Sequence, residues 1–495
     1  MGMVLSSDGK PIYIDTSFST AMNNRLDSLD ALRGLTIAAM LLVNNPGSWS
    51  HIYWPLEHAA WNGWTLTDLV FPFFLFMVGM SMMFSFPKRM ARGESRRALF
   101  GHVLRRAGAL MLLGWWGASW SAIFFAGDAD VGLSGLAFRS GYILLVLAAL
   151  VLLVGTSRAR VWWGVLAGGA VLFVVGFASM GIWDLVLSTD PLLRRLETLR
   201  IPGVLVRIAW CYVAASAIWF LTPQWKAIGA WITGMLLIYA VFMMYVPVPG
   251  FGMPDLARAF PTAATPPGEL FSNWAFYIDY HVFGEHTWSA RQLFDADGRL
   301  IWSFDPEGLV STVPATASVL FGVLAGLFIR RSDLDARDRL NGLFVSGCWL
   351  AVAGLVLSIW MPINKRLWTS SYTVFTAGMA LLTLAVLYHA IDMQGWRRWA
   401  RPLVAYGRNA IFAFVASGMM ATALASIRVP VGGGAGSGNA GAGSTDVFFV
   451  SLKQFLYDAL PGPPEFASFL FGILFVALWA AITMAMDRRR IWLKV

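Results

Sequence analysis

The sequence predicts an all-α, polytopic integral membrane protein, a helical bundle of about 11–12 transmembrane helices. The chain has 495 residues, of which 57% are hydrophobic and 13% are charged. A soluble protein would carry roughly twice that charged fraction. Apolar runs of about 20 residues, each long enough to cross a bilayer, recur along the chain. Basic residues also alternate between successive loops, which is typical of a membrane protein with a fixed orientation.

The apolar runs define the order of the predicted spans. Residues 1–30 form a polar lead, and residues 31–495 form one membrane domain. The predicted spans cover residues 31–47, 64–86, 107–126, 139–156, 160–180, 203–221, 226–246, 309–329, 341–360, 371–391, 402–426 and 464–486.

Three segments between these spans have their own character. The leucines and charges of residues 184–202 have helical spacing, which indicates an amphipathic helix at the membrane interface. Residues 247–308 form the largest loop and could cover a site. Residues 431–445 form a Gly-rich loop without a phosphate-binding lysine, so we expect a flexible connection there.

Basic residues mark one side of the membrane. They concentrate in segments such as 88–97 and 330–339, whereas the loops at 48–63 and 126–138 contain none. Positive loops stay in the cytoplasm, so both termini are predicted to be cytoplasmic and the loop at 48–63 periplasmic in a bacterial inner membrane. The formal net charge of +9 follows from these loops, so the predicted partners include membrane lipids and no nucleic acid.

Polar residues gather where the chain should be at the outer membrane surface. Between the first two spans lie Asn44, Asn45, Glu57, His58, Asn62 and Asp68. Three other segments place polar or aromatic residues at the same level, namely Arg207, then Asp305 and Glu307, then Asn364, Lys365, Trp368, Ser370 and Ser371. Polar groups beside membrane spans are costly, and convergence of four segments indicates an enclosed site.

Several of these residues also have a purely structural interpretation. Asp305 and Glu307 would cap the helix that follows them, and Ser370 or Ser371 could cap the predicted span 371–391. Lys365 could be a solvated charge at the rim.

Arg207 is harder to explain structurally, because it lies one turn inside the sixth span. A guanidinium there requires an anion. A carboxylate among Asp305, Glu307 and Asp68 would serve, and so would a ligand phosphate.

His58 is the strongest catalytic candidate. It lies between the carboxylate of Glu57 and the aromatic WNGW segment at a span entrance. A neutral imidazole near an apolar wall is a suitable general base near pH 7, and it can also be acylated transiently. No metal site is predicted, because no second His or Cys lies at a ligand spacing such as HxxxH or CxxC.

Six segments resemble the family of transmembrane acyltransferases typified by heparan-α-glucosaminide N-acetyltransferase. They are RLDSLDALRGLTIAAMLLVNN, HAAWNGWTLTDLVFPFFLFMVG, GVLVRIAWCY, DPEGLVSTVPATASVLFG, PINKRLWTSSYTVFTAG and PLVAYGRNAIFAF. They extend in this order from about Arg25 to Phe414. Bacterial relatives in that family include inner-membrane proteins of the NagX type, which are associated with N-acetylglucosamine use, and the chain resembles a member of this type.

The resemblance implies transfer of an acetyl group from cytoplasmic acetyl-CoA to a glucosamine-type amino sugar at the periplasmic side. It implies catalytic roles for His58 and Asn44, and it also implies a homodimer. Residues implied to line the path of CoA and its acetyl group are Arg207, Asn364, Lys365, Trp368, Ser370 and Ser371. The other polar residues of the site are assigned to the acceptor sugar, namely Glu57, Asn62, Asp68, Asp305 and Glu307. The phosphates of CoA should then meet basic groups at the inner face, such as Arg105, Arg106 or Arg401.

Two other functions fit the same polar residues. The chain could be an inner-membrane transporter of N-acetylglucosamine or a related sugar, since twelve spans with both ends inside suit a transporter. It could also acylate a lipid or a glycan of the cell envelope. The sequence leaves open the acceptor, the acyl length, and the choice between a ping-pong and a ternary-complex route.

Overall fold

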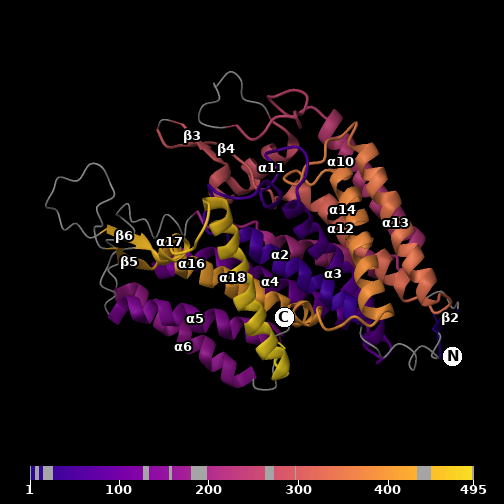
Figure 1. Cartoon of the computed structure of the whole chain (residues 1–495), viewed down its shortest axis with the longest axis horizontal. Helices are drawn as coiled ribbons and strands as arrows, with labels where there is room; N and C mark the ends of the chain where they lie inside the picture. The colour runs from indigo at the N-terminus through magenta and orange to yellow at the C-terminus, as the bar shows by residue number, and fades with distance from the viewer. Residues whose placement is uncertain are drawn as a thin grey trace.

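The computed structural model is a bundle of long helices with a small cap over one end (Figure 1). It describes residues 2–5, 11–14, 26–125, 133–154, 159–179, 198–261, 272–295, 297–431 and 448–492. Residues 184–197 and 432–445, which carry most of the predicted amphipathic helix and of the Gly-rich loop, lie outside this description.

Helices account for most of the described chain. The bundle contains α2 (Asp27–Asn44), α3 (Leu66–Met90), α4 (Arg96–Phe125), α5 (Leu133–Val154), α6 (Ala159–Ser179), α9 (Val204–Leu221), α10 (Trp225–Tyr245), α12 (Leu309–Ile329), α13 (Ala336–Leu357), α14 (Ser370–Leu387), α15 (Arg401–Arg408), α16 (Ala410–Ser426) and α18 (Pro464–Arg488). A π-helical turn (Tyr388–Met393) extends α14, and the short helix α17 (Leu452–Asp458) precedes α18. Two-stranded antiparallel sheets pair β1 (Gly2–Leu5) with β2 (Pro11–Ile14) and β5 (Arg428–Val431) with β6 (Phe448–Ser451).

The helices confirm a polytopic membrane protein. Among the described residues, seven helices are long and apolar enough to cross a membrane, or up to eight if the bent pair α15–α16 is one span. This number is below the predicted one, although every predicted span overlaps a helix. Helix α2 is not counted because it carries the charged residues Asp27, Asp30 and Arg33. The apolar helices at 139–151 and 161–176 are not counted because they are short.

The predicted span 402–426 is wrong as a single straight helix. Helices α15 and α16 meet at an angle of 87°. The break is at Asn409, whose backbone leaves the helical region at φ −120° and ψ 32°. Its side-chain amide donates to the carbonyl oxygen of Ile491 over 3.2 Å, so a contact from the C-terminal segment holds the bend.

Helices α3 and α12 cross with their backbones in contact. A Cβ atom at Gly79 would lie 1.9 Å from the carbonyl oxygen of Val319, and one at Gly322 would lie 1.9 Å from that of Phe76. Small residues permit such close crossings between membrane helices. The crossing matters for function because α3 begins just after His58 and α12 begins just after Glu307.

Replacing Gly322 with valine is therefore expected to destabilise the bundle by at least about 1–3 kcal/mol, the usual cost of overpacking. The measurement is thermal unfolding of the purified protein in detergent. Gly234→Val in α10 is the matched control, since a Cβ at Gly234 has no heavy atom within 4 Å. Equal melting temperatures for the two variants would contradict the tight crossing.

A cap covers the end of the bundle at which α3 and α12 begin (Figure 1). It contains α11 (Trp274–Phe283) and a hairpin of β3 (Gln292–Phe294) and β4 (Leu300–Ser303), with Leu293 opposite Trp302. Its buried apolar cluster includes Trp61 from the loop before α3, and the Trp61 indole donates to the Leu256 carbonyl over 3.0 Å. The predicted 247–308 loop thus packs directly on the WNGW segment.

Candidate functional site

Three polar side chains meet where α3 begins. The helix starts with a capping box in which Asp68 and Thr65 bond each other's backbone. One oxygen of Asp68 accepts from the backbone N–H groups of Thr65 and Ala59, each over 3.1 Å. The other oxygen lies 2.7 Å from Nδ1 of His58.

This geometry fixes the state of the imidazole. The Asp68 side chain is 1% exposed, and that of His58 is 45% exposed. A carboxylate that accepts two backbone N–H bonds is favoured in its charged form. His58 therefore donates through Nδ1, and its Nε2 carries the lone pair that a general base or nucleophile needs.

Lys365 completes this group from the loop between α13 and α14. Its ammonium lies 3.1 Å from His58 Nδ1 and 3.5 Å from Asp68 Oδ1. Burial lowers the pKa of Lys365, although the charges of Asp68 and Glu307 oppose the shift. The loop is held by Asn364, whose amide donates to Asn62 over 3.0 Å and whose Oδ1 accepts from Leu367 N over 2.9 Å.

A second group of charges lies at the start of α12. Arg200 makes a two-pronged contact with the buried Asp305, with N···O distances of 2.8 and 2.7 Å, and it also pairs with Glu307. Burial raises the pKa of Asp305 despite this partner. Burial acts the same way on Glu307, but the cations Arg200, Arg207 and Lys365 outweigh it and hold the pKa of that carboxyl below its usual range.

Asp279 connects the cap to this group. Its carboxylate accepts from the backbone N–H groups of Asp305 and Leu309, over 3.1 and 3.3 Å, and thereby caps α12. Burial raises the pKa of Asp279 well above its ordinary value.

Arg207 is fully buried in α9 and faces α12 and α14. Its Nη2 donates to Ser311 Oγ and, over 3.2 Å, to the carbonyl oxygen of Gly308. The guanidinium carbon lies 5.2 Å from the ring centre of Trp368, whose indole donates to Ser318 over 3.1 Å. Within the described chain, the Nε and Nη1 atoms of Arg207 have no hydrogen-bond partner.

The remaining predicted residues have simpler surroundings. Ser370 donates to the Leu236 carbonyl over 2.8 Å, and Ser371 donates to the Pro362 carbonyl over 3.1 Å. Glu57 is exposed beside His58.

A cavity of about 530 Å³, here called the basic cavity, lies between α2, α3, α4, α9 and the α15–α16 bend. Along α3 it runs from Phe74 to Lys88, a rise of about 21 Å. Its charged lining residues are Asp30, Arg33, Lys88, Arg106 and Arg408. Of the three arginines expected to meet CoA phosphates, only Arg106 is among the described lining residues, while Arg105 contacts His102.

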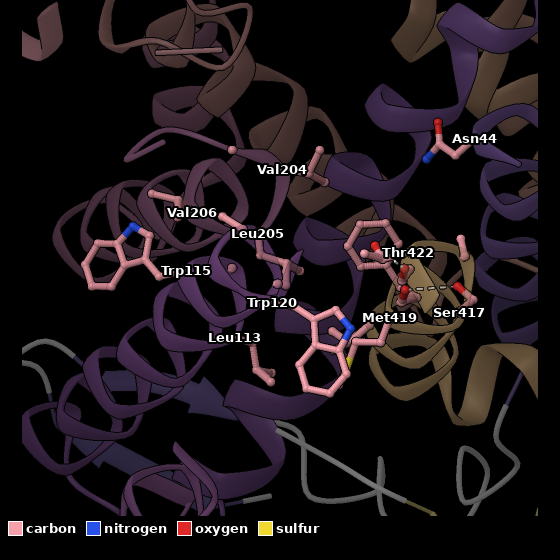
Figure 2. Close-up of a pocket in the computed structure, with 18 of the residues that line it drawn as sticks. Asn44, Leu113, Trp115, Trp120, Val204, Leu205, Val206, Ser417, Met419 and Thr422 are labelled. Carbon is pink, nitrogen blue, oxygen red and sulfur yellow. Dashed lines mark hydrogen bonds between the residues drawn. The ribbon is translucent and has the colours of Figure 1, made fainter. Parts of the chain in front are cut away.

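A second cavity, here called the Asn44 cavity, has a volume of about 410 Å³ (Figure 2). Asn44 at the end of α2 and Arg200 are among its polar lining groups, and Trp115 and Trp120 of α4 are among its aromatic ones. Leu205 of α9 lines both cavities. His58 does not line either cavity in the described structure, so Asn44 and His58 are not brought together as the sequence suggests.

Comparison with known proteins places this site in context. The chain is 26% identical over 435 residues to heparan-alpha-glucosaminide N-acetyltransferase of Mus musculus, a match that covers 83% of this chain and 55% of the relative. It is 26% identical over 420 residues to the protein of that name from Homo sapiens, covering 80% and 53%. No family model matches the chain. The chain spans about half the length of the curated relatives it matches, and it is a distant relative of a membrane N-acetyltransferase.

Some residues of the site escaped the sequence analysis. Arg200 lies in the stretch interpreted as an interfacial helix, and nothing local connects it to Asp305, 105 residues later. The spacing of Thr65 and Asp68 is a readable capping signal, and it could have identified Asp68 as the residue that organises the loop.

Proposed function

We propose that the protein is a membrane acyltransferase that moves an acetyl group from acetyl-CoA to the amine of an amino sugar, with His58 as the base. The observation that carries the proposal is the contact between His58 Nδ1 and the buried Asp68, which makes Nε2, 3.4 Å from the Lys365 ammonium, the lone-pair side of a half-exposed imidazole. An imidazole held at Nδ1 with its lone pair at Nε2 is the arrangement that general-base and nucleophilic catalysis both require. The distant likeness to N-acetyltransferases supports the same class of reaction.

The two cavities support acetyl-CoA as the donor. The phosphates of CoA are anionic and require basic partners, which Lys88 and Arg106 offer at the mouth of the basic cavity. Neither of them forms a salt bridge within the described chain, unlike Arg408, which pairs with Asp487 over 3.0 Å. The pantetheine arm would then pass the apolar wall at Leu205 toward Asn44.

The chemistry balances with groups of this chain. The acceptor nitrogen attacks the thioester carbonyl carbon while His58 Nε2 takes its proton, and Asp68 stabilises the imidazolium. Asn44 lines the cavity that the acetyl arm would enter and is assigned as the oxyanion donor, a role that requires Asn44 and His58 to approach each other when the substrates are bound. The C–S bond then breaks, and the thiolate takes the proton from His58, so the products are an amide and free CoA thiol.

A ping-pong route uses the same residues in two steps. His58 Nε2 attacks the thioester carbon, the C–S bond breaks, and CoA leaves as the thiolate, so that an acetyl-imidazolium forms whose Nδ1 proton Asp68 holds. The amine then attacks the acetyl carbon, the bond from that carbon to Nε2 breaks, and the proton of the amine passes to the thiolate. Asn62 and Glu57, which flank His58 on the cap side, are assigned to the acceptor. The side chains of Ser370, Ser371 and Trp368 are committed to protein partners, which favours a supporting role for them. The NagX type, the bacterial inner membrane, cytoplasmic termini, a periplasmic acceptor and a homodimer stay predictions of the sequence.

Reconstituted protein is expected to release CoA thiol from acetyl-CoA and to form N-acetylglucosamine when glucosamine is supplied. The assay uses proteoliposomes with acetyl-CoA on one face and labelled glucosamine on the other, and it measures thiol release and the labelled product. Transfer across the bilayer supports the proposal. Uptake of labelled N-acetylglucosamine without acetyl-CoA, together with no thiol release, would show a transporter instead.

A further inference from the structure

Two nitrogen groups share one buried carboxylate in the site. Asp68 Oδ1 lies 2.7 Å from His58 Nδ1 and 3.5 Å from the ammonium of Lys365, and the two nitrogens lie 3.1 Å apart. Because Nδ1 donates to Asp68, it cannot also accept from Lys365. The ammonium also lies 3.4 Å from Nε2, so it can donate to the lone pair there, and it acts on the imidazole as a positive charge at close range.

The surrounding charges do not relieve this crowding. Asp68 of α3 faces the pair directly, and Glu307 before α12 acts on Lys365 at longer range. Glu307 itself is held by Arg200. Arg366, the next residue after Lys365, adds another cation and lies 5.7 Å from the ring centre of Trp61. Asp68 is thus the carboxylate that contacts both His58 and Lys365.

A second proton on His58 would place an imidazolium beside an ammonium against a single carboxylate. Like charges at this range disfavour the charged form of each other. Removing the ammonium would leave the whole Asp68 charge to His58 and favour the imidazolium. The proton on Nδ1 is unaffected in either case, because Asp68 holds it.

We propose that Lys365 is a positioning residue that keeps the His58 imidazole neutral, so that its Nε2 is unprotonated when the acceptor arrives. The same charge speeds the return of the acceptor's proton from His58 to the leaving thiolate. This catalytic consequence rests on the proposed acyl transfer, whereas the charge coupling between the two residues does not.

The coupling can be measured without any turnover. Diethyl pyrocarbonate reacts with neutral imidazole, so its rate at His58, followed by mass spectrometry of the His58 peptide, reports the pH at which half of these side chains are neutral. In Lys365→Met this midpoint is expected to rise by about one pH unit, a tenfold change in proton affinity. Lys365→Gln should act like Lys365→Met, and Lys365→Arg, which keeps the charge, should leave the midpoint near that of the unmodified protein.

His51 provides an internal control in the same loop. Its side chain is 43% exposed and contacts Glu465 over 3.4 Å rather than Lys365, so its midpoint should stay constant in every variant. Equal His58 midpoints in the unmodified protein and Lys365→Met would overturn the proposal. A shift in Lys365→Arg as large as that in Lys365→Met would also overturn it, because packing rather than charge would then be responsible.

Activity separates this inference from the proposed function. In Lys365→Met the pH at which the rate of acetyl transfer falls on the acidic side should rise together with the His58 midpoint. KM for acetyl-CoA should stay unchanged. A raised KM with an unmoved limb would instead assign Lys365 to CoA binding and reject the positioning role. If the protein transfers no acetyl group at all, the proposed function fails while the modification result still decides the coupling.

Discussion

Replacing His58 with alanine is expected to lower the rate of acetyl transfer at saturating donor and acceptor by about 10²–10⁴-fold, the usual contribution of a general base. The loss should appear in kcat, because the imidazole accepts its proton only as the acceptor nitrogen attacks. Asp68→Asn should lose nearly as much, since the amide no longer holds the Nδ1 proton that the carboxylate accepts over 2.7 Å. Release of CoA thiol by the purified variants measures both effects.

The matched control is His51→Ala, which removes another histidine of the same loop. His51 contacts Glu465 at the protein surface and is not bonded to Asp68, so its loss should leave kcat within about twofold. Thermal unfolding of each variant verifies that the bundle is intact. Full turnover by His58→Ala would refute the mechanism and leave any acetyl transfer to another group.

The membrane helices could be predicted from the sequence because length and apolarity decide them locally. The span predicted at 309–329 has the bounds of α12, since a mostly apolar run without charged residues is flanked there by Gly308 and Arg330. The bend inside the predicted span 402–426 could not be predicted in the same way. It depends on the contact between Asn409 and Ile491, which are 82 residues apart in the chain.

The gathering of polar residues beside the start of α3 could be predicted from the sequence better than the contacts between them. Alternation of basic loops placed His58 and Lys365 at one membrane level, and the fold brings them into contact across 307 residues of sequence. The partner of His58 was not evident from the sequence. The Asp68 carboxylate contacts the imidazole only because the preceding loop folds back onto the start of α3. Arg207 was expected on the path of CoA, but its orientation toward Ser311 and Trp368 is set by helix packing that no local pattern reveals.

Charge reversal at the mouth of the basic cavity, by Lys88→Glu or Arg106→Glu, is expected to raise KM for acetyl-CoA by about 10- to 100-fold. A hydrogen bond to a charged group contributes about 1.5–3 kcal/mol, and reversal adds repulsion of the CoA phosphates. The turnover number should change little, because Lys88 lies about 30 Å along α3 from Asp68 and the chemistry at His58. Initial rates of thiol release across a range of acetyl-CoA concentrations give both constants.

Arg105→Glu distinguishes a phosphate site from a general effect of surface charge. Arg105 neighbours Arg106 on α4 and is equally exposed, yet it contacts His102 and is not among the described lining residues of the basic cavity. If the cavity binds the CoA phosphates, Arg105→Glu should change KM by no more than about twofold at physiological ionic strength, where exposed charges are largely screened. Equal effects of Arg105→Glu and Arg106→Glu would mean that acetyl-CoA is attracted by the basic face as a whole. In that case the path from the basic cavity past Leu205 to Asn44 would lose its main support.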